Sequence, residues 1–188
     1  MMRIITGEAR GVRLESPKDD SVRPTTEMAK EGLFSSIQFE IEGRRVLDLF
    51  AGSGQLGLEA ISRGASLAVF VDSATASVEL VKNNARKTGL FDRCRVLHTD
   101  YAAYLKGFSD LPFDYIFVDP PYDLSLIEDA VRRLFKSGCV GEDTLIFCES
   151  DTADVALDSV ADAEIVKRYK YGKTYVHVVK RKSDTTDR

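Results

Sequence analysis

The sequence contains no long apolar run. A membrane-spanning helix needs about 20 consecutive, mostly apolar residues, and no stretch of the 188 residues approaches that length. The first five residues also lack the apolar stretch and the small-residue cleavage site of a secretory signal. These absences argue against a membrane-spanning helix, and we expect a cytoplasmic protein.

Cysteine and histidine are scarce as well. The three cysteines, Cys94, Cys139 and Cys148, are odd in number and have no metal-ligand spacing. We therefore expect reduced thiols and no metal site. The two histidines, His98 and His177, each lie on a predicted strand, where a structural role is more common than that of a catalytic base.

Net positive charge is also missing, because 26 Lys and Arg face 30 Asp and Glu, for a net charge of −4. Residues 165–183 nevertheless carry seven basic residues and no acid, which leaves −11 for the rest of the chain. Such a cluster indicates contact with RNA or DNA, or alternatively an edge strand that lysines protect from aggregation. The basic residues that we expect to contact RNA are Arg10, Arg13, Arg23, Lys170 and Lys173.

The middle of the chain predicts an α/β fold. The hydrophobic content of 44% is enough for one substantial core. Short apolar stretches, which are typical of parallel strands covered on both faces, alternate with amphipathic ones, so we predict a doubly wound sheet. The predicted strands are 46–50, 67–71, 95–98, 115–118 and 144–148, and the predicted helices are 56–63, 76–87, 102–106 and 126–135.

The C-terminal part departs from this alternation. Residues 163–171 and 174–182 predict two strands joined by a tight turn at Gly172-Lys173. This hairpin would add an antiparallel element to one edge of the sheet, which would then be mostly parallel with seven strands.

The N-terminal part predicts a small extension. Residues 3–15 indicate a hairpin, and Thr25 or Thr26 can cap a helix that runs to about Gln38. We expect an extension over residues 1–40, a main domain over residues 41–183 and a frayed tail over residues 184–188.

A glycine-rich turn joins the first predicted strand to the next helix. Residues 48–57 read Asp-Leu-Phe-Ala-Gly-Ser-Gly-Gln-Leu-Gly. Glycines let the backbone approach a ligand, and the helix N-terminus offers unpaired N–H groups. Asp72, at the end of the second strand, can accept hydrogen bonds from two ribose hydroxyls. Taken alone, this motif fits a dinucleotide nearly as well as S-adenosylmethionine.

Two acids favour S-adenosylmethionine. Asp48 could meet the ammonium of a methionine moiety, whereas it would repel a pyrophosphate. Asp100 could hold the adenine amine, although an acid after a strand is also a common helix cap. The cofactor-binding residues expected from these motifs are Asp48, Phe50, Ala51, Gly52, Ser53, Gly54, Asp72 and Asp100.

The most specific motif is Asp119-Pro120-Pro121-Tyr122, which follows the apolar strand 115–118. A planar exocyclic amine is a poor nucleophile because its lone pair is delocalised into the ring. The Asp119 carboxylate and the Pro120 carbonyl could accept both of its N–H bonds and direct the lone pair at a sulfonium methyl. Tyr122 could stack on a flipped or unpaired base. The alternative is a rigid turn with a capping acid.

Further segments accompany these motifs. They are Arg3-Ile4-Ile5-Thr6-Gly7, Arg10-Gly11, Val22-Arg23-Pro24-Thr25-Thr26, Lys30-Glu31-Gly32-Leu33-Phe34 and Cys148-Glu149-Ser150. In order and spacing, this set resembles the bacterial family that methylates the N2 atom of a guanine in 16S ribosomal RNA. The likeness spans almost the whole chain.

The resemblance implies a class I methyltransferase fold, S-adenosylmethionine as donor, and 16S rRNA in the 30S subunit or an assembly intermediate as substrate. It places Arg23, Pro24 and Thr25 near the cofactor and the target base. We also expect Asp119 to contact the cofactor as well as the amine. Lys30 stands where the family often has Arg. Gly32 replaces a better helix former, at a cost of roughly 1 kcal/mol in helix propensity, and a tilted helix there could alter RNA docking.

Three other functions are compatible with parts of the sequence. A DNA adenine-N6 or cytosine-N4 methyltransferase would use the same amine chemistry, although the short chain shows no separate target-recognition domain. A dinucleotide-dependent oxidoreductase would use the glycine turn but would leave residues 119–122 unexplained. A non-catalytic RNA-binding module would use the basic C-terminal hairpin alone.

Overall fold

The computed structural model describes residues 2–17, 27–121, 124–155 and 157–183. The predictions for Arg23, Pro24, Thr25 and Tyr122, and the predicted tail, lie outside the described residues. Within the described part of the chain, no helix is long and apolar enough to cross a membrane.

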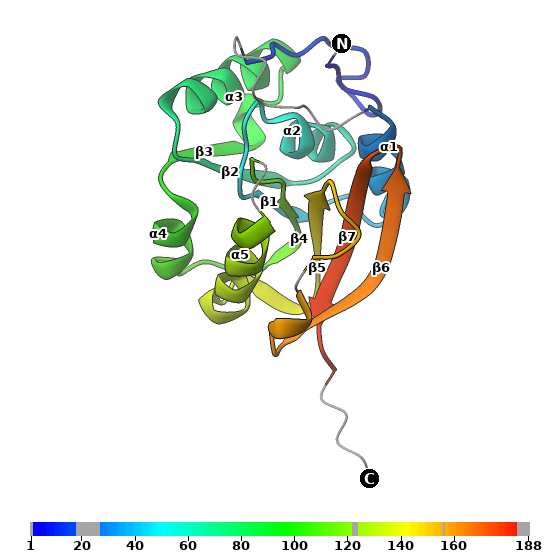
Figure 1. The fold of residues 1–188 in the computed structure, drawn as a ribbon. Coiled ribbons are helices and arrows are strands. Elements are labelled where there is room, and N and C mark those ends of the chain that lie inside the picture. The colour runs from blue at the N-terminus through cyan, green and yellow to red at the C-terminus, as the bar shows by residue number, and fades with distance from the viewer. Residues whose placement is uncertain (1, 18–26, 122–123, 156, 184–188) are drawn as a thin grey trace.

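Seven strands form one sheet in the order β3-β2-β1-β4-β5-β7-β6 (Figure 1). The strands are β1 (Arg45–Asp48), β2 (Leu67–Asp72), β3 (Cys94–His98), β4 (Phe113–Val118), β5 (Val140–Ser150), β6 (Ala163–Tyr171) and β7 (Thr174–Arg181). The helices are α1 (Glu27–Ser35), α2 (Gln55–Ser62), α3 (Thr75–Thr88), α4 (Tyr101–Lys106) and α5 (Leu124–Ser137), with short 3-10 turns at Phe91–Arg93 and Leu157–Ser159. The predicted doubly wound α/β fold is confirmed.

The first five strands are parallel, and the strand order reverses between β1 and β4. Ligands of open α/β sheets bind at such a reversal, beyond the carboxyl ends of the strands. The C-terminal hairpin is also confirmed, because β7 pairs antiparallel with β5 and β6 pairs antiparallel with β7. Gly172 takes a left-handed conformation (φ +62°) in the turn between them.

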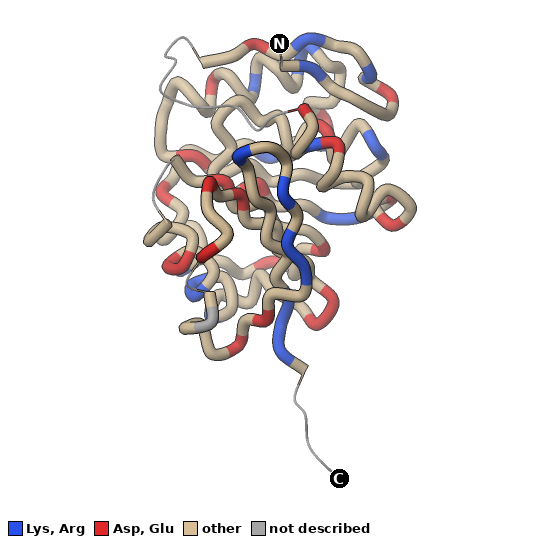
Figure 2. Tube along the Cα trace, turned by 45° about the vertical axis from the view of Figure 1, so that its right-hand side comes forward, with Lys and Arg blue, Asp and Glu red and all other residues tan. Residues whose placement is uncertain are grey.

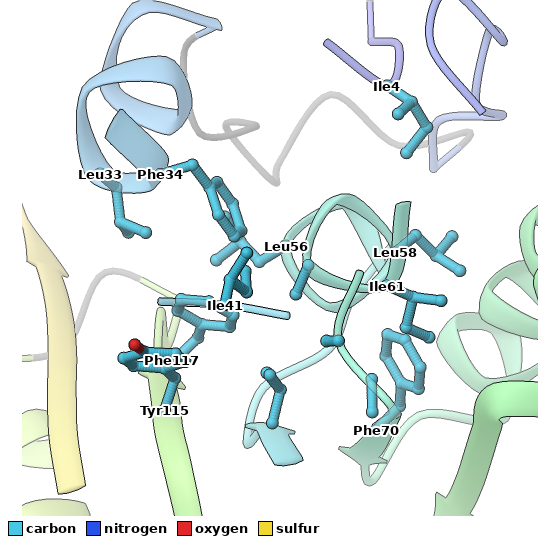
Figure 3. Close-up of a cluster of buried hydrophobic side chains, with 14 of the residues drawn as sticks. Ile4, Leu33, Phe34, Ile41, Leu56, Leu58, Ile61, Phe70, Tyr115 and Phe117 are labelled. Carbon is cyan, nitrogen blue, oxygen red and sulfur yellow. The ribbon is translucent and has the colours of Figure 1, made fainter. Parts of the chain in front are cut away.

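The sheet has an apolar cluster on each face. One cluster contains side chains of α1, α2 and α3, and we call this side the α1 face; the other contains side chains of α4 and α5, and we call it the α5 face. Figure 3 shows Phe34 of α1 and Phe117 of β4 within the α1-face cluster, with ring centroids 5.5 Å apart. Because side chains alternate along a strand, every second residue of β1, β2, β4 and β5 points to the α1 face.

The N-terminal segment packs against the α1 face. Arg3 and Arg13 form an antiparallel bridge, and the Ile4 N–H donates to the Val12 carbonyl at 3.0 Å, as the predicted hairpin requires. Ile4 is fully buried in the same cluster as Phe34 and Phe117 (Figure 3). The N-terminal segment therefore shares a core with the sheet, and the division at residue 40 stays a prediction.

A buried carboxylate anchors this segment. Glu59 of α2 accepts hydrogen bonds from the Ile5 and Thr6 N–H groups at 2.8 and 3.0 Å. Its carboxylate also pairs with Arg63 at 2.8 Å and with Lys30 at 3.5 Å. Burial lowers the pKa of Lys30, and the neighbouring Glu59 opposes that shift. Lys30 thus forms a buried ion pair between α1 and α2.

Helix α1 differs from its prediction in length and in the role of its glycine. It ends at Ser35 instead of about Gln38, and turns follow it. Gly32 lies against Tyr171 of β6, so a side chain at this position would collide with the tyrosine ring. The glycine therefore permits the close approach of α1 to the C-terminal hairpin.

Candidate active site

Acidic side chains gather at the carboxyl end of the sheet. One row of register partners crosses four strands: Phe70, Asp48, Phe117 and Phe147. Two positions further along the chain come Asp72 of β2, Asp119 directly after the end of β4, and Glu149 of β5. Since the side-chain period of a strand is two, these three acids continue the same α1 face as Asp48.

Two neighbouring hollows lie at this edge. The larger, of about 480 Å³, is lined by Asp72, Asp100, Asp119 and Glu149 among others. The smaller, of about 50 Å³, is lined by Asp48, Ser53 and Gln55 among others. Both are lined by Phe50, Gly52 and Asp119, so these three residues lie where the hollows adjoin. An elongated ligand with two polar ends would fit such an arrangement.

The glycine turn has the geometry that its sequence predicts. Gly52 and Gly54 adopt left-handed conformations, with φ of +54° and +78°. Gly57 has a different role: a Cβ on it would lie 2.3 Å from the Phe70 ring, so this glycine lets α2 pack closely on β2. Gly54 is the N-cap of α2 and, having no side chain, makes no side-chain capping hydrogen bond.

Asp48 is buried at the base of this turn. Its Oδ2 atom accepts a hydrogen bond from the Gly57 N–H at 3.1 Å. Burial raises the pKa of Asp48 well above its ordinary value, and the charges of Asp119 and Asp72 raise it further, while the Gly57 hydrogen bond opposes the shift. A cationic ligand group would relieve this accumulation of negative charge, whereas a pyrophosphate would add to it.

Asp72 and Asp100 line the larger hollow, and both already hold backbone groups. Asp72 accepts from the Gly52 N–H at 2.9 Å and from the Ala74 N–H at 2.8 Å, so it braces the glycine turn. Asp100 caps α4, because its Oδ1 atom accepts from the Ala102 N–H at 2.8 Å and the Ala103 N–H at 3.3 Å. The helix-cap role of Asp100 is therefore observed, and its contact with an adenine stays a prediction.

An aromatic pair lines the same hollow. The rings of Phe50 and Tyr101 lie 5.0 Å apart between centroids, tilted by 43°. The Tyr101 hydroxyl donates to Asp129 at 2.7 Å, which fixes the ring, and burial and this carboxylate raise the pKa of Tyr101 to about 12. Phe50 was expected at a cofactor, whereas Tyr101 was not. Its position directly after Asp100, at the end of a strand, is the sequence signal that could have identified it.

Asp119, Pro120 and Pro121 line the larger hollow, and Asp119 lines the smaller one as well. Glu149, Ser150 and Thr174 line it as well. Glu149 was not expected at the site on its own. Like Asp72 and Asp119, however, it is an acid at the carboxyl end of a strand, and this feature could have identified it.

The residues expected to bind RNA are exposed where the structure describes them. Arg10 and Arg13 lie on the N-terminal segment, and Lys170 and Lys173 lie on the C-terminal hairpin. Lys170 extends over the ring of Tyr175, with 5.3 Å between the Lys170 Nζ atom and the ring centroid. Figure 2 shows Lys and Arg recurring along the hairpin, so basic residues are concentrated at this edge of the sheet.

The fold and this site define a class I methyltransferase. The solved structure of the Escherichia coli protein yhhF matches with a TM-score of 0.82 and 29% sequence identity, covering 96% of this chain and 98% of that chain. The ribosomal RNA small subunit methyltransferase D of Escherichia coli K12 is 38% identical over 154 residues, 80% of this chain and 75% of that protein. YlbH of Bacillus subtilis is 33% identical over 183 residues, 96% of this chain and 100% of that protein.

Residues 2–180 match the family described as conserved hypothetical protein 95. The chain belongs to this family. The two relatives named above confirm the resemblance to a family of rRNA methyltransferases.

Proposed function

We propose that this protein transfers a methyl group from S-adenosylmethionine to the N2 amine of a guanine in 16S rRNA. The observation that carries the proposal is the position of Asp119 and Pro120 beside the acidic cofactor hollow. The name of the Escherichia coli relative supports a substrate in the small ribosomal subunit. We place the reaction in the cytoplasm, on the 30S subunit or an assembly intermediate.

The side chains of the two hollows suit S-adenosylmethionine. The Phe50 and Tyr101 rings would together pack against one side of the adenine, Asp72 would accept from the ribose hydroxyls, and Asp48 would pair with the methionine ammonium. Burial raises the pKa of Asp48, and the charges of Asp119 and Asp72 raise it further, which supports a cationic ligand over a dinucleotide. When bound, S-adenosylmethionine supplies an electrophilic methyl group.

Asp119 and Pro120 would prepare the amine for attack. The Asp119 carboxylate and the Pro120 carbonyl would each accept one N–H of the exocyclic amine, which favours a pyramidal nitrogen. The nitrogen lone pair then forms the new N–C bond while the S–C bond breaks. The proton that the nitrogen loses passes to the Asp119 carboxylate or to water. Positioning and electrostatics supply the catalysis without a covalent intermediate.

The RNA must present this guanine outside a helix, because the amine is out of reach within a stacked duplex. The exposed basic residues on the two ends of the chain, Arg10, Arg13, Lys170 and Lys173, would hold the flanking phosphates. We also assign Arg23, Thr25 and Tyr122, which lie outside the described residues, to the cofactor and the target base.

Transfer of labelled methyl groups tests the proposal. The protein would be incubated with 30S particles, free 16S RNA and DNA, and the product nucleosides would be identified. We expect N2-methylguanosine from 30S particles or 16S RNA. Methylated adenine or cytosine in DNA would support the alternative amine methyltransferase. Calorimetric binding of NAD without binding of S-adenosylmethionine would overturn the whole assignment.

A further inference from the structure

Glu149 stands beside Asp119 at the end of the neighbouring strand. Strands β4 and β5 are parallel, and Val118 is the register partner of Cys148. Glu149 is the next residue of β5, and Asp119 is the first residue beyond β4, so the two follow a register pair on strands that are about 4.8 Å apart. Both side chains belong to the α1 face, and both residues line the larger hollow.

Ser150, the next residue along β5, is less suited than Glu149 to hydrogen-bond a base. The Ser150 hydroxyl donates to the Thr152 carbonyl at 2.7 Å and lies 3.0 Å from the His177 Nε2 atom. Its hydrogen-bonding capacity is thus committed on the α5 face. On the α1 face, the register partner of Glu149 on β7 is Val176, an apolar and fully buried residue. Glu149 is therefore the polar side chain that β5 and β7 present next to Asp119 in this row.

The pattern of hydrogen-bond donors and acceptors on the base explains how this carboxylate could select guanine. In guanine, the N2 amine lies between N1, which carries a hydrogen and donates, and N3, which carries a lone pair. On the Watson–Crick edge its neighbour is N1. In adenine and cytosine, the ring nitrogen beside the exocyclic amine carries a lone pair and accepts. An ionised carboxylate accepts hydrogen bonds and cannot donate them. It would pair with guanine N1–H and repel the ring nitrogen of adenine or cytosine.

We propose that Glu149 is a specificity-determining residue that accepts a hydrogen bond from N1–H of the target guanine, while Asp119 and Pro120 hold its N2 amine. This inference rests on the proposed function and explains why a motif shared by methyltransferases of several amines would select guanine. A site built around such a bond discriminates strongly against a base that lacks the hydrogen, since the acceptor is then left unpaired.

The test uses 2-aminopurine, which keeps the N2 amine but has an unprotonated N1. Once the methylated nucleotide is mapped, 30S particles are reconstituted with 16S RNA that carries guanine or 2-aminopurine at that position. We expect the unaltered protein to prefer guanine by about 30-fold or more in kcat/KM. Glu149→Gln can donate to N1 through its amide, so we expect the guanine preference to fall by about tenfold or more.

Two further variants serve as controls, and one binding measurement tests whether each variant is folded. Glu149→Asp keeps an acceptor, so it should turn over more slowly yet retain a preference for guanine. Glu142→Gln makes the same chemical change at an exposed position of β5, and it should keep the full preference. Affinity for S-adenosylmethionine, measured by calorimetry, verifies that each variant is folded.

The outcomes separate this inference from the proposed function. A protein that methylates guanine but uses 2-aminopurine equally well, or a folded Glu149→Gln with an unchanged preference, overturns the role of Glu149 alone. A protein that methylates a different amine, or none, overturns the proposed function and this inference with it.

Discussion

The ring of Tyr171 lies where a side chain on Gly32 would have to go: a Cβ built on Gly32 would come within 2.1 Å of the ring. The contact joins α1 to the edge strand β6. Tyr171 is itself stacked on Tyr169, with 6.1 Å between ring centroids. A change at position 32 would therefore be transmitted to the aromatic surface of the hairpin.

We predict that Gly32→Ala reverses its effect on stability when Tyr171 is removed. In most helices this change stabilises by roughly 1 kcal/mol, but here overpacking against the ring should cost about 1–3 kcal/mol. With Tyr171→Ala already present, the same change should stabilise. Urea unfolding of the four proteins in a double-mutant cycle gives the coupling energy. Equal effects of Gly32→Ala in both backgrounds would show that the ring moves aside without cost.

Local signals predicted much of the site, since they depend on neighbouring residues. A tight turn needs the left-handed conformations of Gly52 and Gly54, and a proline pair after an apolar strand fixes a rigid backbone at its end. The same sequence rules placed Asp48 and Asp72 at adjacent strand ends.

Contacts set by the pairing of distant segments could not be predicted in this way. The buried acid Glu59 sits in an apolar helix, and its partners Lys30 and Ile5 lie on other segments, 29 and 54 positions away. Gly32 was interpreted through helix propensity because nothing near it in the chain indicates Tyr171. The register that brings Glu149 beside Asp119 likewise follows from the sheet.

Asp48→Asn should stabilise the cofactor-free protein while it weakens cofactor binding. Because burial raises the pKa of Asp48 in the folded state, the folded protein loses stability as the pH rises from the unfolded pKa through the folded one. Above the folded pKa, a neutral amide should therefore raise the melting temperature, while it weakens S-adenosylmethionine binding by about tenfold or more through the lost ammonium pair.

The stabilising effect of Asp48→Asn should shrink as the pH falls, since the native carboxyl then becomes neutral as well. Melting temperatures of the apo protein and calorimetric affinities across a pH series would measure both effects. Asp143→Asn, at an exposed position of β5, is the matched control and should show neither. A lower melting temperature for Asp48→Asn at neutral pH would show that burial of the Asp48 carboxylate does not destabilise the folded protein.

Asp119→Ala should remove methyl transfer while sparing the cofactor. We expect a loss of about 100- to 1000-fold in kcat, the usual effect of deleting one polar group that is aimed at the reacting atoms. Affinity for S-adenosylmethionine should stay within a few fold, because Asp48 and Asp72 would still hold the two ends of the molecule. Single-turnover rates together with calorimetry would check both parts. Asp92→Ala removes an exposed acid and should leave both quantities unchanged, whereas a fully active Asp119→Ala protein would place the activation of the amine elsewhere.

Charge reversal on the C-terminal hairpin should change how RNA binding responds to salt. Lys170 and Lys173 are exposed on the basic edge of the sheet (Figure 2), and each phosphate that they neutralise would release bound counterions. In Lys170→Glu with Lys173→Glu, affinity for 16S RNA should fall, and the slope of log K against log salt should decrease in magnitude by roughly 1 to 2. Lys87→Glu with Lys136→Glu makes the same change of net charge at the ends of α3 and α5, so it separates a local contact from the overall charge. If both double variants reduced the slope equally, or neither did, the hairpin lysines would protect an open edge strand instead of holding RNA.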